Sequence, residues 1–418
     1  MILTKYKLGE ILDVTRGASL SGEYYATEGE YIRLTCGNFD YQNNCFKENK
    51  SKDNLYYVGD FKSEFLMEEG DIITPLTEQA IGLLGSTAII PESGKYIQSQ
   101  DVAKIICKED LLDKDFAFYL ISSALVKQQL SAAAQQTKIR HTSPDKIKDC
   151  TVWIPELSEQ KRIGKLLRSI DRKIELNRAI NQNLEAMAKQ LYDYWFVQFD
   201  FPNEKGKPYK SSGGEMVWNE KLKRMIPKEW TNANIYQLAS ISKETVNPLA
   251  RPNELFKHYS LPEYDKTGTY AEEYGIDIQS AKFTVTNNCI LVSKLNPWTS
   301  RVICGNRESN QICSTEFVVW NPASMKTKGF LFMLAKSAKF IEYCTQGATG
   351  TSHSHRRINP ELMMKFDFSY NSEIAIKFSR LIENIIGKLH DNIAQLKVLT
   401  KQRDELLPLL MNGQITIE

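Results

Sequence analysis

Two kinds of feature are scarce in this 418-residue sequence: paired cysteines and long apolar runs. The eight cysteines are scattered without a CxxC pair, so neither a disulfide framework nor a zinc site is expected. No apolar run approaches the roughly 20 residues that a membrane-spanning helix needs. Residues 1–9 alternate in polarity and do not resemble a signal peptide. We therefore expect a cytoplasmic chain with no membrane contact.

Motifs of several enzyme classes are missing as well. No two glycines stand two positions apart, which excludes the GxG of dinucleotide and methyl-donor sites, and no phosphate loop GxxxxGK[ST] occurs. None of the Asn-Pro pairs, which begin at Asn247, Asn296, Asn321 and Asn359, continues as the Asn-Pro-Pro-aromatic motif of amino-methyltransferases. We expect no catalytic residue, metal or cofactor in this chain. The net charge of +2 neither requires nor excludes nucleic acid.

One pattern resembles a metal-dependent nuclease, because Pro144-Asp145 is followed by Glu159-Gln160-Lys161. In such enzymes the carboxylates bind a divalent metal and the lysine steadies the attacking water. That chemistry needs the aspartate and the Glu-x-Lys run on adjacent strands, whereas Glu159 and Lys161 begin a predicted helix. The second half of the chain has no equivalent. We interpret the match as coincidence.

An internal repeat is the main positive feature. Four features recur in the same order, separated by 214 (330 − 116) to 218 (289 − 71) positions. They are the buried-strand pattern 70–74 with 288–292, the segment 98–102 with 313–317, the helix-like run 116–130 with 330–344, and Pro144 with Pro360. The offset between the paired segments varies by only a few positions, which indicates two copies of one fold with small loop insertions.

A long amphipathic helix follows each copy. Apolar residues recur at alternating spacings of four and three after Ser158, the expected N-cap, and again in the second copy. This 3.5-residue period is typical of a coiled coil. The two seams superpose after a shift of 215 (392 − 177), and their residues are Ile170, Ile174, Asn177, Leu184, Ile385, Leu389, Asn392 and Leu399. The alternative is a pair of ordinary amphipathic helices, each packed on its own domain.

These patterns divide the chain into five segments. Short β-rich runs punctuated by Gly, Pro and Asn give each copy a mixed character, and Pro, Gly and Ser between the copies indicate a linker. The predicted segments are a first domain (1–155), a central helix (156–199), a linker (200–229), a second domain (230–372) and a C-terminal helix (373–413).

Several segments resemble the specificity subunit of type I restriction–modification enzymes. In the first half they are 153–163 (WIPELSEQKRI), 169–177 (SIDRKIELN) and 191–196 (LYDYWF). In the second half they are 292–297 (VSKLNP), 313–317 (CSTEF), 348–352 (ATGTS) and 406–413 (LLPLLMNG). Two features depart from the family pattern. His353 and His355 stand where related loops tend to carry glycine and arginine, and 371–373 lacks the PELSEQ lead-in of the first copy.

The resemblance implies an α+β fold of two tandem mixed α/β target-recognition domains, each followed by a long helix, with the two helices pairing as an antiparallel coiled coil. Each domain would read one half of a split, asymmetric site on double-stranded DNA. The helices would set the unread gap and dock two methyltransferase subunits, which bind S-adenosylmethionine. Motor-nuclease subunits that use ATP and Mg would complete the complex, and this chain would carry no active site.

Base edges are read by hydrogen bonds from polar side chains on rigid loops. In the first copy the candidates that follow buried strands or the helix are Thr77, Glu78, Gln79, Lys138, Arg140 and His141. In the second copy they are Lys294, Asn296, Trp298, Arg301, Thr315, His353, His355, Arg356 and Arg357. Each could instead be a solvated loop residue, and the basic residues could contact phosphates alone.

The main alternative function is a non-enzymatic coiled-coil scaffold that binds only protein. A scaffold shares every helix feature of the sequence. It has no reason to keep homologous polar and basic loops at matching positions of the two copies, which favours DNA recognition.

Overall fold

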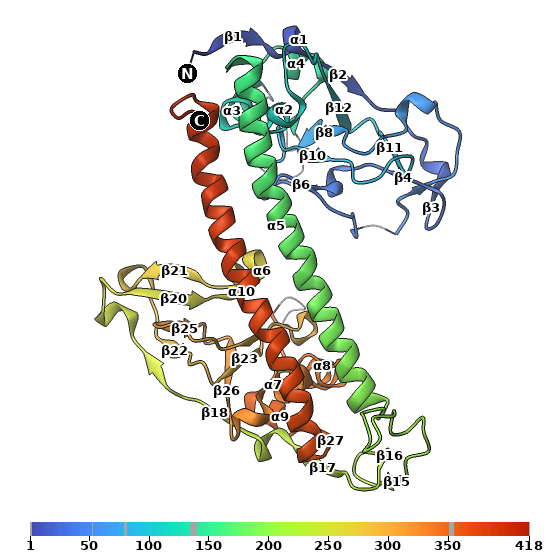
Figure 1. Ribbon diagram of the computed structural model, residues 1–418, viewed down its shortest axis with the longest axis vertical. Coiled ribbons are helices and arrows are strands. Elements are labelled where there is room, and N and C mark those ends of the chain that lie inside the picture. Colours follow the sequence, from blue (N-terminus) through green and yellow to red (C-terminus); the bar gives the residue numbers. More distant parts are fainter. Residues whose placement is uncertain (1, 52, 79–81, 134–139, 351–354, 418) are drawn as a thin grey trace. The chain divides into compact units, whose positions relative to one another are not determined.

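The computed structural model describes the whole chain except residues 1, 52, 79–81, 134–139, 351–354 and 418. The chain forms two compact units, and each is described by itself. Unit 1 comprises residues 1–175 and 398–418, and unit 2 comprises residues 176–397. Both combine sheets with helices (Figure 1), so the expected fold class is confirmed.

Unit 1 is built around an antiparallel sheet with strand order β10–β8–β12–β2. A smaller sheet has the order β11–β4–β7–β3, in which β11 and β4 are parallel. The strands of these sheets are β2 (Leu12–Arg16), β3 (Tyr25–Ala26), β4 (Tyr31–Arg33), β7 (Tyr56–Tyr57), β8 (Ile72–Pro75), β10 (Ala88–Ile89), β11 (Tyr96–Ile97) and β12 (Val102–Cys107). Three strand pairs are β1 (Thr4–Lys7) with β14 (Thr151–Ile154), β5 (Phe39–Asp40) with β6 (Cys45–Phe46), and β9 (Thr77–Glu78) with β13 (Arg140–His141).

Helices pack against the main sheet of unit 1, and the helices and the sheet together form the core of the unit. The short helices are α1 (Leu8–Ile11), α2 (Lys114–Ile121), α3 (Ala124–Ala133) and α4 (Pro144–Lys148). Ile72 and Ile105 from the sheet, Phe116 of α2, and Ile163 and Leu167 of the long helix α5 (Leu157–Tyr192) belong to one buried cluster. The apolar residues in the first part of α5 therefore anchor that part of the helix to its own domain.

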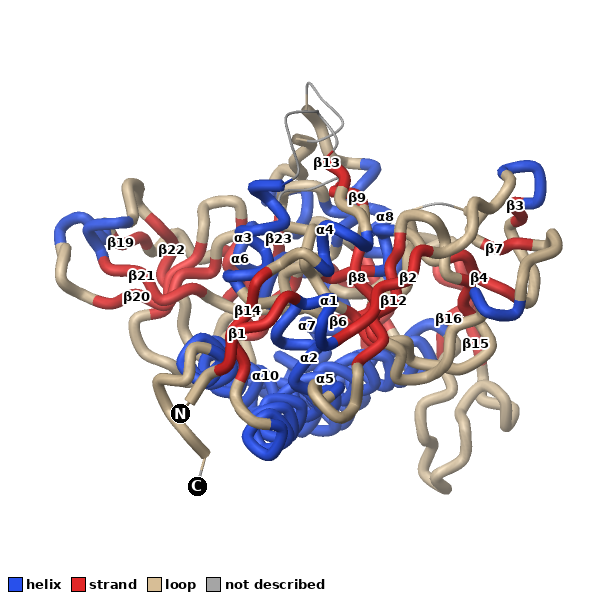
Figure 2. The backbone as a smooth tube through the Cα atoms, turned by 90° about the horizontal axis from the view of Figure 1, so that it is seen from above, coloured by secondary structure: helices blue, strands red, loops and turns tan. Residues whose placement is uncertain are grey.

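Unit 2 repeats this plan with a larger second sheet. Its main sheet has the order β18–β26–β23–β24, and its second sheet has the order β19–β22–β25–β20–β21, with β20 and β25 parallel. The strands lie at β18 (Ala239–Ile241), β19 (Thr245–Val246), β20 (Leu255–Tyr259), β21 (Ala271–Tyr274), β22 (Lys282–Thr284), β23 (Ile290–Ser293), β24 (Val302–Cys304), β25 (Gln311–Cys313) and β26 (Phe317–Pro322). Figure 2 shows strands β19 to β22 of the second sheet gathered together.

Several of the remaining elements of unit 2 match those of unit 1. Strand β17 (Thr231–Asn234) pairs with β27 (Asp367–Tyr370), as β1 does with β14. The helices are α6 (Leu261–Thr267), α7 (Lys328–Ala335), α8 (Ala338–Gln346) and α9 (Pro360–Met364). Pro144 and Pro360, predicted as repeat partners, begin the equivalent helices α4 and α9. The predicted repeat is thus visible as repeated topology.

The run expected to form one helix in each copy forms two. The first break falls between α2 and α3, and the second falls between α7 and α8. At both breaks a serine hydroxyl accepts a hydrogen bond from the amide three residues later, Ser123 from Val126 and Ser337 from Phe340, each at 3.4 Å. A serine N-cap starts a new helix at these positions, and periodicity alone does not reveal it.

The segment 200–229, expected to be a linker, is a folded part of unit 2. Strands β15 (Met216–Asn219) and β16 (Arg224–Pro227) form a hairpin. Phe201 is buried and stacks on Tyr209 and on Trp230, with ring centres 4.8 and 5.2 Å apart. These aromatic contacts outweigh the turn-rich composition that suggested a loose connection.

Two long helices, α5 and α10 (Ser372–Met411), carry the predicted seams. Helix α5 starts at Leu157, one residue before the expected N-cap, and continues into a π-type turn at Asp193–Val197. In unit 2, Asn177 donates to Gln395 at 3.2 Å and Asn181 accepts from Asn392 at 3.0 Å. From one hydrogen-bonded pair to the next, the residue number rises on α5 and falls on α10. The two helices are therefore antiparallel in unit 2 (Figure 1).

Burial supports the predicted shift of 215 between the two helices. Ile163 and its equivalent Phe378 are both fully buried, as are Leu167 and Ile382. Of the predicted seam residues, Ile170, Ile174 and Leu389 are buried, and Asn177, Leu184, Ile385, Asn392 and Leu399 are half-buried. The first part of α5 in unit 1 and the first part of α10 in unit 2 are therefore equivalent.

Candidate functional site

Unit 1 brings together two predicted segments at the end of its central strand β8. The next strand, β9, pairs with β13 so that Thr77 lies opposite His141 and Glu78 lies opposite Arg140. These residues are 64 and 62 positions apart in sequence (141 − 77 and 140 − 78). The pairing places predicted contact residues of both segments side by side.

Unit 2 forms the same arrangement after β23. A β-bridge joins Leu295 to Arg357, and the amide of Asn296 donates to the carbonyl of Arg356 at 2.8 Å. These positions lie 218 (295 − 77) and 216 (357 − 141) residues after their counterparts in unit 1. The displacement equals that of the sequence repeat, so the two pairs are structurally equivalent.

A third segment joins the pair through matching backbone hydrogen bonds. In unit 1, Leu76 donates to the carbonyl of Asp101 at 2.8 Å. In unit 2, Lys294 donates to the carbonyl of Glu316 at 2.9 Å. We call residues 76–78, 101 and 140–142 the unit 1 cluster. We call residues 294–296, 315–316 and 356–358 the unit 2 cluster. Each is a set of loops fixed by backbone bonds to a sheet.

The unit 1 cluster has a buried floor and an exposed rim. The hydroxyl of Thr77 is buried and lies 3.3 Å from Oδ1 of Asp101 and 3.3 Å from Nδ1 of His141. The Glu78 carboxylate is also buried and accepts from the amide of Gly82 at 2.8 Å. His141 is exposed. Thr77 and Glu78 therefore shape the loop, whereas His141 is available to a ligand.

The unit 2 cluster presents a paired arginine. Arg357 donates through Nε and Nη2 to the two carboxylate oxygens of Glu316, at 2.9 and 3.0 Å. Hydrogen bonding to Glu316 is the largest cause of the raised pKa of Arg357, and the negative charge of Glu316 is the second. Arg357 therefore stays cationic. The Arg357 side chain is 45% exposed, so its free edge can face a phosphate or a base. Arg356 instead donates to the carbonyl of Ala348 at 2.5 Å and is half-buried.

A constrained turn beside the unit 2 cluster displays an aromatic ring. Asn296 and Ser300 have φ values of 48° and 50°, in the left-handed region that residues other than glycine seldom adopt. They flank the 3-10 turn η8 (Pro297–Thr299), whose Trp298 is 44% exposed. The amide of Arg356 donates to Oδ1 of Asn296 at 3.1 Å. The turn and the cluster are thus one hydrogen-bonded structure.

Arg301, at the end of this turn, has a structural partner. Its guanidinium binds both carboxylate oxygens of Asp265 on α6, at 2.5 and 2.8 Å, and its side chain is only 13% exposed. A cavity of about 10 Å³ beneath the turn, lined partly by Pro297, Arg301 and Phe340, has space for about one water molecule. The turn therefore rests on a well-packed base.

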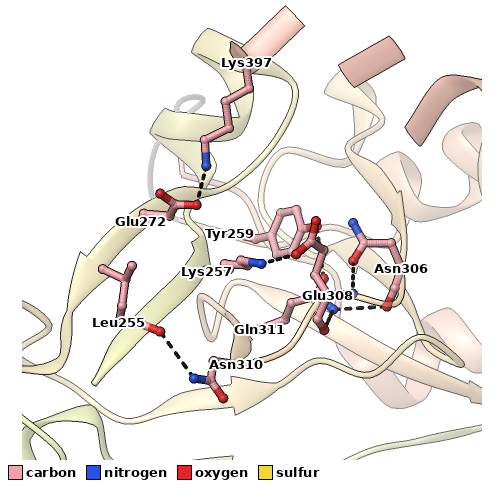
Figure 3. Close-up of polar contacts among 9 residues, drawn as sticks. All are labelled: Leu255, Lys257, Tyr259, Glu272, Asn306, Glu308, Asn310, Gln311 and Lys397. Atoms are coloured by element: carbon pink, nitrogen blue, oxygen red, sulfur yellow. Dashed lines mark hydrogen bonds and ion pairs between the residues drawn. The ribbon is translucent and has the colours of Figure 1, made fainter. Parts of the chain in front are cut away.

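Helix α10 is bound to the second sheet of unit 2 (Figure 3). The ammonium of Lys397 lies 2.7 Å from Oε1 of Glu272 on β21 and 4.5 Å from the ring centre of Tyr270. In the same view Lys257 pairs with Glu308, and Gln311 donates to the carbonyls of Asn306 and Glu308. These contacts connect the long helix to the sheet and order the loop 305–310.

The clusters contain most of the predicted contact residues. Thr315, His355 and Lys294 also lie at the unit 2 cluster or directly next to it; the first two are exposed and Lys294 is half-buried. Gln79, Lys138 and His353 lie outside the described residues, and the side chain of Arg140 is likewise undescribed. Sequence reasoning missed the carboxylates of Asp101 and Glu316. Both belong to the repeated segments 98–102 and 313–317, which could have identified them.

The described residues form neither a cluster of metal-ligating side chains nor a membrane-spanning helix. No three His, Cys, Asp or Glu side chains gather there as a metal site. Glu159 and Lys161 lie on α5 and Asp145 lies on α4, so the nuclease-like pattern lacks its two strands. No helix among the described residues is long and apolar enough to cross a membrane.

Comparisons with known proteins converge on one family. Residues 3–186 match the model of the type I restriction modification DNA specificity domain. The chain is 22% identical over 332 residues to the type I restriction enzyme MjaIX specificity subunit of Methanocaldococcus jannaschii, covering 77% of this chain and 73% of that protein. It is 22% identical over 375 residues to the HindI specificity subunit of Haemophilus influenzae, covering 77% and 81% respectively.

A solved structure agrees on the fold. The S subunit of a type I restriction–modification system from M. genitalium matches with a TM-score of 0.63 at 15% identity, over 98% of this chain and 96% of that one. At this identity the likeness concerns the fold alone.

Proposed function

We propose that this chain, which belongs to the specificity subunits of type I restriction–modification systems, recognises a bipartite, asymmetric site on double-stranded DNA. Unit 1 reads one half of the site and unit 2 reads the other. The helices α5 and α10 set the length of the unread gap. Because the side chains of the two clusters differ, the two half-sites differ in sequence.

The observation that carries this proposal is the equivalence of the two clusters. Both follow the central strand of the main sheet, and both have the same three-segment backbone bonding. Their exposed residues, His141 in one and Thr315 and Arg357 in the other, differ in chemistry. A common backbone with variable polar side chains suits the reading of different bases by hydrogen bonds.

The long helix α5 also offers a surface for protein partners. Leu176, Ile180 and Met187 are 61%, 38% and 57% exposed. At 100° per residue, spacings of 4 and 7 place them on one face of the helix. An exposed apolar stripe of this kind marks a protein interface. We assign it to the docking of methyltransferase subunits, two of which would bind the chain.

The chemistry of the complex belongs to its other subunits in this proposal. The methyltransferase subunits bind S-adenosylmethionine, and motor-nuclease subunits use ATP and Mg. The isolated chain should therefore transfer no methyl group from labelled S-adenosylmethionine to DNA and should cut no DNA when Mg is added. Either activity in the pure chain would contradict this division of labour.

Gel retardation of a random pool of duplex oligonucleotides tests DNA recognition directly. The chain with its methyltransferase partner should enrich two fixed blocks separated by a constant unread gap. Retention of the pool without enrichment would indicate DNA binding without recognition. No retention with intact partner binding would instead favour a scaffold that binds only protein.

A further inference from the structure

A buried polar triad joins three elements of unit 1. The hydroxyl of Tyr119 on α2 donates to Oδ2 of Asp171 on α5 at 2.5 Å. Nη1 of Arg403 on α10 donates to Oδ1 of the same carboxylate at 3.3 Å. The three residues are 2%, 8% and 9% exposed. Arg403 also binds Asp404, and Arg168 lies close to Tyr119.

The equivalent positions of unit 2 are apolar. A shift of 214 takes Tyr119 to Met333, and a shift of 215 takes Asp171 to Ile386 and relates Arg403 to Ala188. Met333, Ile386 and Ala188 are 3%, 9% and 4% exposed and belong to one buried cluster. The same three-residue position is therefore ionic in one unit and apolar in the other, although the backbone plan is the same.

We propose that the triad of Tyr119, Asp171 and Arg403 makes the two helices pair with each other and prevents each from pairing with a second copy of itself. Pairing of a helix with a second copy of itself is possible because of the repeat: α5 and α10 are equivalent helices with superposable seams. Two α5 helices could associate antiparallel as α5 and α10 do, and so could two α10 helices.

Each mispairing breaks the buried ion pair between Asp171 and Arg403, so that Asp171 keeps only the neutral hydroxyl of Tyr119 and Arg403 keeps only Asp404 of its own helix. An α5 pair between two chains places Asp171 of each chain opposite Ala188 of the other. An α10 pair places Arg403 of each chain opposite Ile386. An unpaired buried charge is strongly destabilising, and buried polar groups in coiled coils are known to fix the choice of partner. Only the α5–α10 pair places the two buried charges, Asp171 and Arg403, against each other. This inference concerns the pairing of the chain and does not depend on DNA recognition.

The experiment detects α5 self-pairing in full-length chains. Since Asn181 lies against Asn392, and Asn392 is equivalent to Asn177, self-paired α5 helices place Asn177 of one chain near Asn181 of the other. Two differently tagged chains, one carrying Asn177→Cys and the other Asn181→Cys, are co-expressed. The yield of disulfide-linked heterodimer is measured on non-reducing gels, with chains lacking the added cysteines as the blank.

The decisive variant copies the unit 2 residues into unit 1: Tyr119→Met, Asp171→Ile and Arg403→Ala together. We expect its thermal midpoint to equal or exceed that of the parent, because the same residues pack well in unit 2. We expect its heterodimer yield to rise by about tenfold or more. The conservative Arg403→Lys should keep the yield low.

A second variant separates pairing from stability. Ile382→Val removes a buried methylene group in unit 2 and leaves the triad intact, so it should lower the thermal midpoint without raising the heterodimer yield. The proposal is overturned if the triple variant gives the parent yield. It is also overturned if Ile382→Val raises the yield as much as the triple variant does.

Discussion

Arg357 is the residue whose environment best fits DNA contact. Replacing it with Ala removes an exposed cation whose ion pair with Glu316 contributes little to folding, because exposed pairs are weak. We expect the thermal midpoint to be unchanged and DNA binding by the assembled methyltransferase to weaken. If Arg357 contacts a phosphate, the slope of log affinity against log salt should fall by about one. If it reads a base, discrimination at one position should fall about tenfold or more.

The matched control is Arg251→Ala. Arg251 is also an exposed arginine paired with a glutamate, Glu254, but it lies outside the unit 2 cluster. Its replacement should leave affinity, salt slope and discrimination unchanged. If the two substitutions have equal effects, Arg357 contributes to DNA binding only through the net charge of the protein.

Gly350 closes the loop that carries the unit 2 arginines. A Cβ there would lie 2.5 Å from the carbonyl oxygen of His355 and 3.0 Å from Cα of Arg356, both backbone atoms. Gly350→Ala should therefore displace the loop, lower stability by about 1–3 kcal/mol and abolish recognition by unit 2. The same substitution at Gly387, a helical position with open space around it, should stabilise the chain by about 0.5–1 kcal/mol. Thermal unfolding and DNA binding of both variants provide the measurements.

Single residues also show what a sequence can and cannot predict. The polar candidates were found because the repeat placed Thr77 and Lys294, or His141 and Arg357, in corresponding segments. Sequence could not show that Arg301 is bound by Asp265 on α6, because that contact joins positions 36 residues apart. It also could not distinguish the buried Glu78 from the exposed His141, which are both polar residues in a predicted loop.

At the scale of elements, Lys397 connects α10 to the second sheet of unit 2. Lys397→Met should remove the ion pair with Glu272 and weaken the contact with Tyr270, at a cost of about 1 kcal/mol or less because the side chains are partly exposed. The expected local effect is faster amide hydrogen exchange in β20 and β21. Lys401→Met, which breaks an exposed pair with Glu405 on the same helix, should leave exchange in those strands unchanged. Unchanged exchange in both variants would mean that the sheet is held by its core alone.

Periodicity predicted elements well where burial follows one regular pattern. Strand β12 (Val102–Cys107) forms at one of the short β-rich runs, and each end of this run is clear in the sequence. The helical runs were extended across the breaks at Ser123 and Ser337, because apolar spacing continues through both. The β15–β16 hairpin could not be predicted, because turn-forming residues dominate the composition of the segment 200–229. That segment is ordered by tertiary contacts, such as those of Phe201 and Trp230, which its composition does not reveal.

At the scale of the whole molecule, the helices should act as a ruler. Four residues inserted after Asn183 add about 6 Å of helix at 1.5 Å per residue, close to two base-pair steps of about 3.4 Å. Four residues are also near one turn, so the apolar stripe stays roughly on its face. We expect a longer unread gap and unchanged half-sites in the DNA modified by a host that expresses the variant.

The control for the ruler is the same insertion after Glu220, in the turn of the β15–β16 hairpin, which leaves both helices unchanged in length. This variant should retain the original gap. If the helix insertion gives an active complex that also retains the original gap, the helices dock partners without measuring DNA.

The central claim is that each unit reads its own half of the site, and sequence mapping of modified DNA tests it most directly. Two loop variants are compared: Arg140→Ala with His141→Ala in unit 1, and Thr315→Ala with Arg357→Ala in unit 2. Each should relax or change bases in one half-site, a different half for each variant, with the other half and the gap intact. Changes in the same half for both variants, or in both halves for either one, would contradict the account.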